Sequence, residues 1–190
     1  MQMEWSDGKK RCCWANPKNE RYIRYHDEEW GVPVYDDGKL FEMLVLECFQ
    51  AGLSWECVLN KREAFREAFD GFDLEAVCAY GEDKLEALRN DPGIIRNRLK
   101  IQAAVTNARV FREIQGEYGG FSRYLWHWTA GKVVYETGLT HSELSDRISK
   151  DLKKRGMKFV GTTVIYAYLQ AVGVIYSHDG GCFLEHKTVV

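Results

Sequence analysis

The sequence predicts an all-α fold, and two observations carry that prediction. Apolar residues recur three and four positions apart along most of the chain, which is the spacing of helices that bury one face. Only three prolines interrupt the 190 residues, and neither a repeat nor a low-complexity linker divides them. With 45% hydrophobic residues, this length suits one fairly large domain, or two small lobes that share a core.

Two strongly patterned helices occupy the first third of the chain. Asp36 can cap a helix that runs to about Gln50 and stops at Gly52. The buried face of that helix would consist of Leu40, Phe41, Leu44, Val45 and Cys48. Ser54 can cap the next helix, which we expect over 54–69. Its inward residues would be Val58, Leu59, Phe65 and Phe69.

The rest of the chain continues the helical pattern. Apolar spacing predicts further helices over 73–80, 82–90, 94–115 and 121–128. Residues 132–136 favour a brief strand. Thr140 and Glu143 have the spacing of a capping box, and the helix that they open would end at Gly156. The last helix is expected over 162–175.

Charge and cysteine content exclude several classes of protein. The formal net charge is −2, so any DNA contact must come from a local basic patch rather than from a global positive field. No signal peptide precedes the six cysteines, and no apolar run reaches the roughly 20 residues that cross a membrane. We therefore expect a cytoplasmic monomer with reduced thiols and no membrane partner.

A basic turn at 153–163, KKRGMKFVGTT, joins the last two helices. Gly156 and Gly161 permit a tight turn, and the first N–H groups of the following helix would be available to a phosphate. The basic residues around the turn are Lys150, Lys153, Lys154, Arg155 and Lys158. This layout is that of a helix–hairpin–helix element, which holds DNA phosphates without reading sequence. The alternative is an ordinary helical hairpin with a solvated basic face. NDPGIIRNRLK at 90–100 is a weaker second candidate, and its alternative is a plain turn.

Both irregular ends of the chain carry Cys and His. His178 and Cys182 stand four positions apart, which is half of a Cys/His zinc site. The N-terminal segment offers Cys12, Cys13 and His26 for the other half, and such a site would tie the two ends together. The alternative is a set of free surface cysteines and histidines.

Glu47 stands inside the apolar run LECFQAGLSW, where a carboxylate needs a partner or a task. The sequence also carries an aromatic cluster of Trp14, Tyr22, Tyr25, Trp30 and Trp55. Aromatic faces attract cations and flat heterocycles, and one helical turn would place Tyr22 and Tyr25 on one face. The alternatives are a carboxylate that caps backbone or pairs with an arginine, and aromatic side chains that fasten a loop to the core.

Together, and in this order, these features resemble the bacterial DNA-3-methyladenine glycosylases of type I. The stretches that carry the resemblance span nearly the whole chain: RCCW, YIRYHDEEWGVP, LFEMLVLECFQAGLSWECVLNKRE, GIIRNRLKIQA, DLKKRGMKFVGTT and HDGGC. The most specific of them are YHDEEWG, QAGLSW and KFVGTT.

The resemblance implies an all-α fold of the helix–hairpin–helix glycosylase superfamily, with one domain over 1–190 whose two lobes flank a base pocket. It implies a structural Zn²⁺ ion, held by Cys12, His26, His178 and Cys182. It implies a catalytic Glu47 in a base pocket formed by Trp14, Tyr22, Tyr25, Trp30 and Trp55. The implied DNA contacts are Gly52 and Leu53, which fill the gap left by a flipped nucleotide, and Lys158, Gly161 and Thr162 of the hairpin.

The implied activity is base-excision repair, by hydrolysis of the N-glycosidic bond of the cationic base 3-methyladenine in double-stranded DNA. The helix after Gly161 holds no acid before Asp179, which lies inside the implied zinc loop. We therefore expect no dedicated catalytic Asp and a narrow range of labile cationic substrates. No lysine is placed for Schiff-base chemistry, so we expect base release without strand cleavage.

Three residues depart from the family pattern. Cys13 adjoins Cys12 where the family usually has one cysteine, and we expect Cys12 to be the ligand. Cys48 replaces a usual glycine beside Glu47, and Phe49 replaces a usual polar residue, so both could alter the pocket wall. Two rival hypotheses are a DNA-binding module without catalysis, which needs no pocket, and a zinc hydrolase, which needs only three protein ligands.

Overall fold

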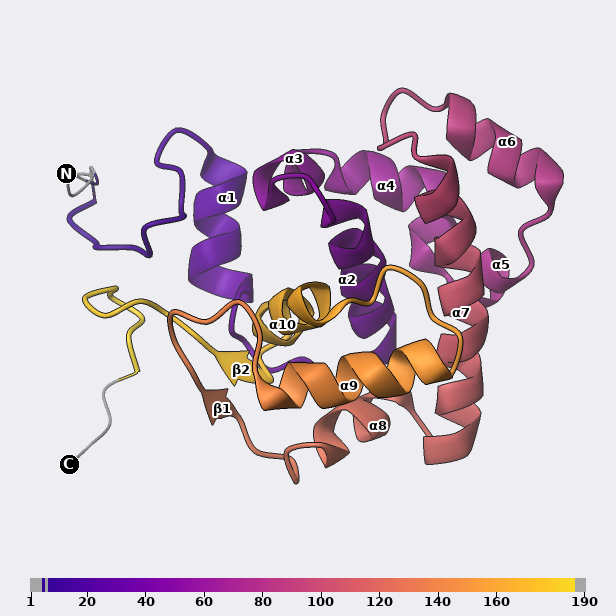
Figure 1. Ribbon diagram of the computed structural model, residues 1–190. Coiled ribbons are helices and arrows are strands. Elements are labelled where there is room, and N and C mark those ends of the chain that lie inside the picture. The colour runs from indigo at the N-terminus through magenta and orange to yellow at the C-terminus, as the bar shows by residue number, and fades with distance from the viewer. Residues whose placement is uncertain (1–4, 6, 187–190) are drawn as a thin grey trace.

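Helices make up nearly all of the regular structure in the computed structural model, which describes residue 5 and residues 7–186 (Figure 1). The α-helices are α1 (Glu20–Arg24), α2 (Asp37–Gln50), α3 (Trp55–Asn60), α4 (Arg62–Ala68), α5 (Leu74–Cys78), α6 (Glu82–Asn90), α7 (Arg98–Tyr118), α8 (Phe121–His127), α9 (Glu143–Lys154) and α10 (Thr162–Ala171). A π-helical turn (Tyr25–Glu29) continues α1, and a 3₁₀ turn (Asp70–Phe72) follows α4. Two short strands, β1 (Val134–Tyr135) and β2 (Ile175–Tyr176), pair in parallel. The predicted helical fold class is confirmed.

Helices α2 and α10 lie at the centre and pack against each other (Figure 1). Every residue of α2 from Leu40 to Phe49 is buried, because other elements cover the helix on all sides. The long helix α7 packs along α2, and α9 packs along α10. The buried apolar side chains of both halves of the chain form one hydrophobic cluster.

Local capping sets the helix starts that the sequence predicted correctly. The Asp36 side chain accepts the Lys39 N–H at 2.8 Å, and the Ser54 hydroxyl accepts the Cys57 N–H at 3.2 Å. Gly52 follows α2 with φ +81°, a backbone conformation that favours glycine. Helix α2 therefore begins and ends where its sequence pattern indicates.

Two predicted boundaries in the first half are wrong. The single helix expected over 54–69 is two helices, α3 and α4, which separate at Lys61. The Lys61 ammonium there donates to the Pro92 and Gly93 carbonyls at 3.3 and 3.0 Å. Helix α7 begins at Arg98 rather than at 94, because the Asn97 side chain accepts the Lys100 N–H at 3.1 Å and caps the helix.

Two predicted boundaries in the second half are also wrong. Ser142 rather than Thr140 precedes α9, and its N–H donates to the Ser145 hydroxyl at 2.9 Å. The last helix ends at Ala171 instead of 175, because Ile175 belongs to β2 and is the register partner of Val134. That pairing joins segments far apart in the sequence, so no local pattern reveals it.

Residues 7–19 and 177–186 lie side by side at one end of the molecule, although the sequence separates them (Figure 1). The Phe183 N–H donates to the Lys10 carbonyl at 2.7 Å, and the Cys13 N–H donates to the Asp179 carboxylate at 2.9 Å. The π-helical turn after α1, which the sequence pattern did not predict, brings His26 to the same place. Among the described helices, none is long and apolar enough to cross a membrane.

Candidate active site

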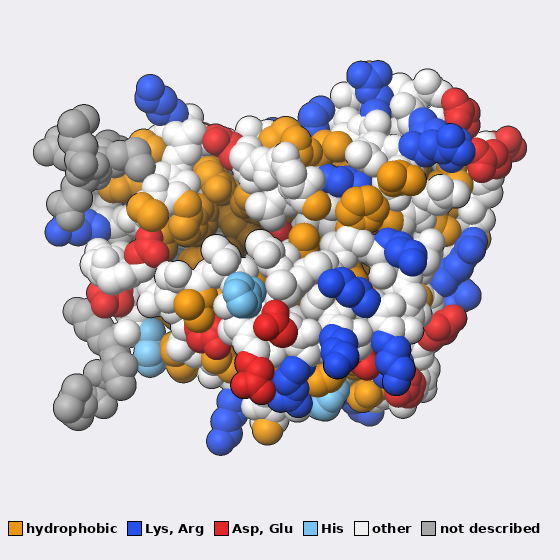
Figure 2. Space-filling model, viewed as in Figure 1, with side chains coloured by type: hydrophobic (Ala, Val, Ile, Leu, Met, Phe, Trp, Pro, Cys, Tyr) orange, Lys and Arg blue, Asp and Glu red, His pale blue; other side chains and the backbone are white. Residues whose placement is uncertain are grey.

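A cavity of about 370 Å³ opens to the surface between α1, α2 and α10, within the size range of small-molecule sites. In Figure 2 it appears as a hollow with hydrophobic walls. Its lining comprises Trp14, Tyr22, Tyr25, Trp30, Glu47, Gln50, Trp55, Gly138, Leu139, Ala167, Gln170, Ser177 and Asp179. The fold thus brings Glu47 and all five expected aromatic residues to one cavity.

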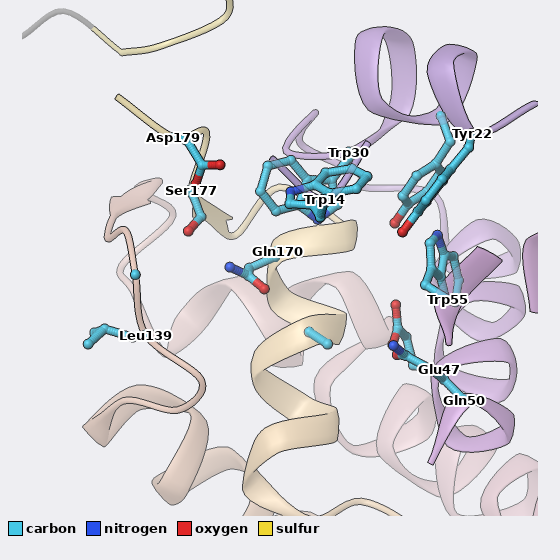
Figure 3. A pocket seen from close by; sticks show the side chains of 13 residues that line it. Trp14, Tyr22, Trp30, Glu47, Gln50, Trp55, Leu139, Gln170, Ser177 and Asp179 are labelled. Atoms are coloured by element: carbon cyan, nitrogen blue, oxygen red, sulfur yellow. The ribbon is translucent and has the colours of Figure 1, made fainter. Parts of the chain in front are cut away.

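The aromatic side chains pack against one another and leave faces toward the cavity (Figure 3). The rings of Trp14 and Tyr22 have centroids 5.3 Å apart, and Trp14 meets Trp30 edge-on at 4.9 Å. The rings of Tyr25 and Trp55 lie 5.2 Å apart. Because these rings pack against one another, the aromatic wall of the cavity is formed without a ligand. They line the cavity as well as fastening the N-terminal segment to the core.

Helix α2 carries two buried glutamates with opposite surroundings. The Glu42 carboxylate accepts hydrogen bonds from Arg62 and Arg66 at 2.7 and 2.9 Å. Burial by itself would raise the pKa of Glu42, but the contacts with Arg62, Arg66 and Lys39 together outweigh it and hold that pKa below its ordinary value. Glu42 is thus the structural, arginine-paired carboxylate that one hypothesis assigned to Glu47.

Glu47 itself has no such partner. Its side chain is 2% exposed, and within the described part of the chain its Oε2 has no hydrogen-bond partner and no cation lies within ion-pair distance. Burial raises the pKa of Glu47 to about 8. An unpartnered buried carboxyl costs free energy, so a ligand that supplies a donor or a positive charge would relieve that cost.

Replacing Glu47 with Gln is expected to stabilise the ligand-free protein, and more so as pH rises from 5 to 8. The folded state keeps a proton on Glu47 up to about pH 8, whereas the unfolded chain loses it near 4.5. The folded state therefore binds more protons in this interval, and the free energy of unfolding of the wild type falls as pH rises. Glutamine has no proton to lose, so the difference should reach roughly 2–5 kcal/mol at pH 8.

Urea unfolding of wild type and Glu47→Gln at pH 5 and pH 8 measures this effect. An equal difference at both pH values would contradict the raised pKa. Glu42→Gln is the matched control on the same helix, and it should destabilise the protein because Arg62 and Arg66 would lose a buried partner.

Four buried side chains form a second cluster beside the cavity. The ligand atoms of Cys12, His26, His178 and Cys182 all lie within 4.8 Å of one another. Cys12 Sγ lies 3.4 Å from His178 Nδ1, and Cys182 Sγ lies 3.6 Å from both His178 Nδ1 and His26 Nε2. Nitrogen and sulfur ligands of a tetrahedral metal ion lie about 3.6 Å apart, so the cluster has the dimensions of a Cys₂His₂ site. The exposed Cys13 is outside it.

The groups around this cluster are those that orient metal ligands. The outer nitrogen of His26, Nδ1, lies 2.8 Å from the Asp27 carboxylate, and the outer nitrogen of His178, Nε2, lies 3.3 Å from the Trp30 carbonyl. Arg11 in turn donates two hydrogen bonds to Asp27. Backbone N–H groups of Asp179 and Leu184 point at the sulfurs of Cys12 and Cys182, at 3.2 and 3.5 Å.

Burial governs the protonation of the cluster. It lowers the pKa of His26 below its ordinary value and that of His178 to about 4, so both imidazoles are neutral and free to bind a cation. Burial also raises the pKa of the Cys12 thiol. A thiolate at this position therefore needs a cation beside it, which a metal ion would supply.

The residues expected to meet DNA lie on two turns beside the cavity. Gly52 and Leu53 follow α2, and the Leu53 side chain is 42% exposed. A side chain added at Gly52 or at Gly161 would meet nothing within 4 Å, so both positions are open to a close approach. The Lys158 side chain is exposed, and its backbone N–H and carbonyl are both held by Asn107 of α7, at 2.8 and 2.9 Å.

Two of the hairpin residues are already engaged within the protein. The Thr162 hydroxyl donates to Asp146 and lies 2.9 Å from the Ser145 hydroxyl, so only its backbone N–H is left for a ligand. Arg155 pairs with Glu117 and Asp151 and is not a free cation. Lys150, Lys153, Lys154 and Lys158 are exposed around the turn. The hairpin therefore presents lysines and backbone N–H groups, which suits phosphate rather than base edges.

A family model described as methyladenine glycosylase matches residues 14–185. The chain belongs to the methyladenine glycosylase family. It is 45% identical over 179 residues to DNA-3-methyladenine glycosylase 1 of Escherichia coli, a match that covers 91% of this chain and 95% of that protein. It is 39% identical over 178 residues to DNA-3-methyladenine glycosylase of Haemophilus influenzae, with 90% and 96% covered.

Solved structures agree with this family assignment. A crystal structure of 3-methyladenine DNA glycosylase I superposes with a TM-score of 0.88 at 43% identity, covering 93% of this chain and 100% of that one. A structure of the Staphylococcus aureus enzyme, solved for its recognition of 3-methyladenine, gives 0.88 at 35% identity, with 94% and 97% covered. The expected resemblance and the expected enzyme class, a glycosylase, are confirmed.

The departures from the methyladenine glycosylase pattern do not reshape the cavity. Phe49 is fully buried and packs against Phe65 and Phe69. Cys48 lies under the hairpin turn, with its sulfur 3.7 Å from Asn107 Nδ2 and 3.9 Å from the Lys158 carbonyl. Neither residue lines the cavity, so neither forms part of its wall. Adjacent residues of a helix point about 100° apart, which turns Cys48 and then Phe49 away from the side on which Glu47 lies.

Several lining residues of this glycosylase were not predicted. Figure 3 shows Gln170 on α10, with Leu139, Ser177 and Asp179 across the cavity from Glu47. The i, i+3 spacing of Ala167 and Gln170 was a signal for a shared helix face, but residues 138–139 lie in a segment without periodicity. Asp179 was expected in the metal-binding loop alone. It also lines the cavity, and one of its carboxylate oxygens accepts a hydrogen bond from the Cys13 N–H.

Proposed function

We propose that this glycosylase removes 3-methyladenine from double-stranded DNA in base-excision repair. It hydrolyses the N-glycosidic bond after the base has turned out of the helix and leaves the strand intact. The observation that carries the proposal is Glu47, a buried carboxyl that has no partner among the described residues and faces the aromatic rings of the cavity. The names of its relatives, which refer to 3-methyladenine, support it.

The cavity suits a cationic purine better than a neutral one. Methylation of adenine at N3 leaves the ring system positively charged, and each well-placed aromatic face attracts such a ring by about 0.5–2 kcal/mol. Glu47 adds Coulomb attraction and accepts a hydrogen bond from the amino edge of the base. The cation provides the positive charge that Glu47 lacks in the empty cavity, so base binding favours ionisation of Glu47. Neutral adenine carries no charge, so its attraction to the aromatic rings and to Glu47 is weaker.

The chemistry then needs little assistance, because a cationic purine is already a good leaving group. The bond between the sugar C1′ and N9 breaks with its electron pair passing to N9, which releases neutral 3-methyladenine. Water adds to the oxocarbenium-like sugar and loses a proton. Ionised Glu47 and the flanking DNA phosphates stabilise the developing positive charge. Because the cationic base leaves so easily, the enzyme needs no dedicated acid on the helix after Gly161.

Two turns would hold the DNA around the flipped base. Leu53 would occupy the gap in the stack, since it is apolar, exposed and next to the cavity. The α9–α10 hairpin would bind a neighbouring phosphate through the backbone N–H groups at Gly161 and Thr162 and the Lys158 ammonium. Damaged bases stack and pair poorly, so extruding them costs least.

Zn²⁺ is the ion that we assign to Cys12, His26, His178 and Cys182. Two thiolates and two imidazoles at tetrahedral spacing form a closed structural site. Its role would be to fasten residues 7–19 to residues 177–186, which together supply Trp14, Ser177 and Asp179 to the cavity wall. A fourfold protein ligand set leaves no open position for a metal-bound water, which weighs against the rival zinc hydrolase.

The test is release of free base from duplex DNA that has been treated with a methylating agent, resolved by chromatography. We expect 3-methyladenine in the supernatant, while 7-methylguanine stays in the DNA and the strands stay uncut. If folded, zinc-replete protein releases neither base, the proposal is wrong and a DNA-binding module without catalysis becomes the better hypothesis. Strand cleavage at the released sites would overturn the monofunctional mechanism.

A further inference from the structure

We infer that the first turn of α7 and the residues just before it form a second DNA-binding surface, in which Arg96 and Arg98 bind backbone phosphates and Leu99 packs against the duplex beside Leu53. This inference rests on the proposed function, because the duplex is the same one. It gives a role to the stretch NDPGIIRNRLK, which belongs neither to the base pocket nor to the α9–α10 hairpin.

Lys100 fixes this surface to the Leu53 turn. Its side chain is buried, and its ammonium donates to the carbonyls of Phe49 and Ala51 at 2.8 and 2.5 Å. These carbonyl groups lie at the C-terminal end of α2, four and two residues before Leu53. A cation at the C-terminus of a helix is favourable, so the contact is stable and keeps the first turn of α7 next to the turn that carries Leu53.

The same helix also fixes the hairpin. Asn107, two turns further along α7, is buried and binds both backbone groups of Lys158. Helix α7 thus sets the distance between the Leu53 turn and the hairpin turn. Residues 96–99, just before Lys100, are exposed, and the Lys100 contacts keep them close to the Leu53 turn.

The exposed arginines before Lys100 have no ion-pair partner among the described residues. Arg96 and Arg98 are exposed, and no carboxylate of the described residues lies within 4.0 Å of either guanidinium. Glu86 lies close enough for the charge of Arg98 to contribute to lowering its pKa, but its carboxylate is bonded to Arg89 and Asn90. Leu99 is 66% exposed, the largest exposed fraction among the large hydrophobic residues that the structure describes.

DNA is the occupant that this chemistry favours. Two free guanidiniums flank a capping Asn97, and guanidiniums bind phosphate oxygens in a bidentate way. An exposed leucine between charged residues is unfavourable in water but suits the sugar edge of a groove. In Figure 2 further Lys and Arg side chains, with some Asp and Glu among them, lie over α7 and α9 to the right of the hollow, so this side offers local basic groups to a duplex.

The experiment measures binding of wild type and variants to a labelled duplex that holds one abasic-site analogue, at several salt concentrations. Arg96→Gln with Arg98→Gln should lower the slope of log K against log salt by about 2, and weaken binding roughly 50-fold near 0.1 M salt. Leu99→Ala should weaken binding about 5-fold with an unchanged slope, because an apolar contact releases no counterions. Melting temperature and binding of free 3-methyladenine should stay at wild-type values in each variant.

Arg112→Gln is the matched control, since it removes one exposed arginine from the same helix about 20 Å away, beyond the reach of screened charges. A double variant that binds with wild-type slope, or no more weakly than Arg112→Gln, overturns the inference. A wild-type protein that neither binds the duplex nor releases base from methylated DNA overturns the proposed function as well. Wild-type base release with unaltered binding by the double variant overturns the second surface alone.

Discussion

Replacing Glu47 with Gln is expected to slow release of 3-methyladenine from methylated duplex DNA by about 100-fold or more. The amide keeps the size and one acceptor of the side chain but removes the negative charge that faces the cationic base. Removing one preorganised electrostatic group from a water-excluded site costs about 10²–10³ in rate. Glu47 lies in such a site, since it is buried and faces the cavity.

Single-turnover release of base, with enzyme in excess over DNA, measures the rate of bond cleavage directly. Glu67→Gln is the control, because Glu67 is exposed on α4, does not line the cavity and undergoes the same replacement of carboxyl by amide. The Glu47 variant should be at least as stable as wild type, so unfolding cannot account for the lost rate. A wild-type rate in Glu47→Gln would remove Glu47 from the catalytic site.

Replacing Cys182 with Ala is expected to abolish stoichiometric zinc binding and to destabilise the protein by roughly 3–5 kcal/mol, a fall in Tm of about 10 °C. The loss removes one of two sulfur ligands and leaves His178 and His26 buried without a metal ion. The contact between the two ends of the chain, and with it the wall formed by Trp14 and Ser177, should loosen.

Metal analysis and calorimetry of Cys182→Ala and Cys13→Ala test this prediction as a pair. Cys13 adjoins Cys12 in sequence but its side chain is exposed and outside the cluster, so Cys13→Ala should keep both zinc and Tm. A wild-type Tm in Cys182→Ala would argue that the metal is absent or incidental. Zinc loss in Cys13→Ala would show that the wrong cysteine has been assigned as ligand.

Cys182→Ala also separates a structural metal from a catalytic one. At a temperature where the variant is still folded, it should release 3-methyladenine at a rate within about tenfold of wild type, since the bond is broken without the metal ion. Complete loss of activity in folded protein would favour the open-site hydrolase hypothesis instead.

The identity of this protein could be inferred from local sequence patterns because most of its signals are local. Caps at Asp36 and Ser54, the left-handed position at Gly52 and the spacing of apolar residues depend on neighbours within a turn or two. The motifs around Glu47 and around the basic turn are also contiguous in sequence. The candidate metal ligands were found as two halves, and the fold joined them.

The ends of helices proved less predictable where a distant segment competes for them. Residues 172–176 continue the apolar pattern of α10, yet Ile175 pairs with Val134 in a parallel ladder. Lys61 divides one predicted helix because its side chain reaches the carbonyls at 92 and 93. Such contacts join residues more than 30 positions apart, and no window of local sequence contains both partners.

The sequence alone determined the fold class, the family and the residue types of the site. Periodicity, caps and contiguous motifs depend on residues that are close together in the sequence. Only the tertiary structure decided that Glu47 has no partner among the described residues whereas Glu42 pairs with Arg62 and Arg66, because pairing depends on where those arginines come to lie. It also decided that Cys48 and Phe49 face away from the cavity, while Gln170, Ser177 and Asp179 complete its wall. Burial without a partner is a property of surrounding elements, and those elements are brought together only by folding.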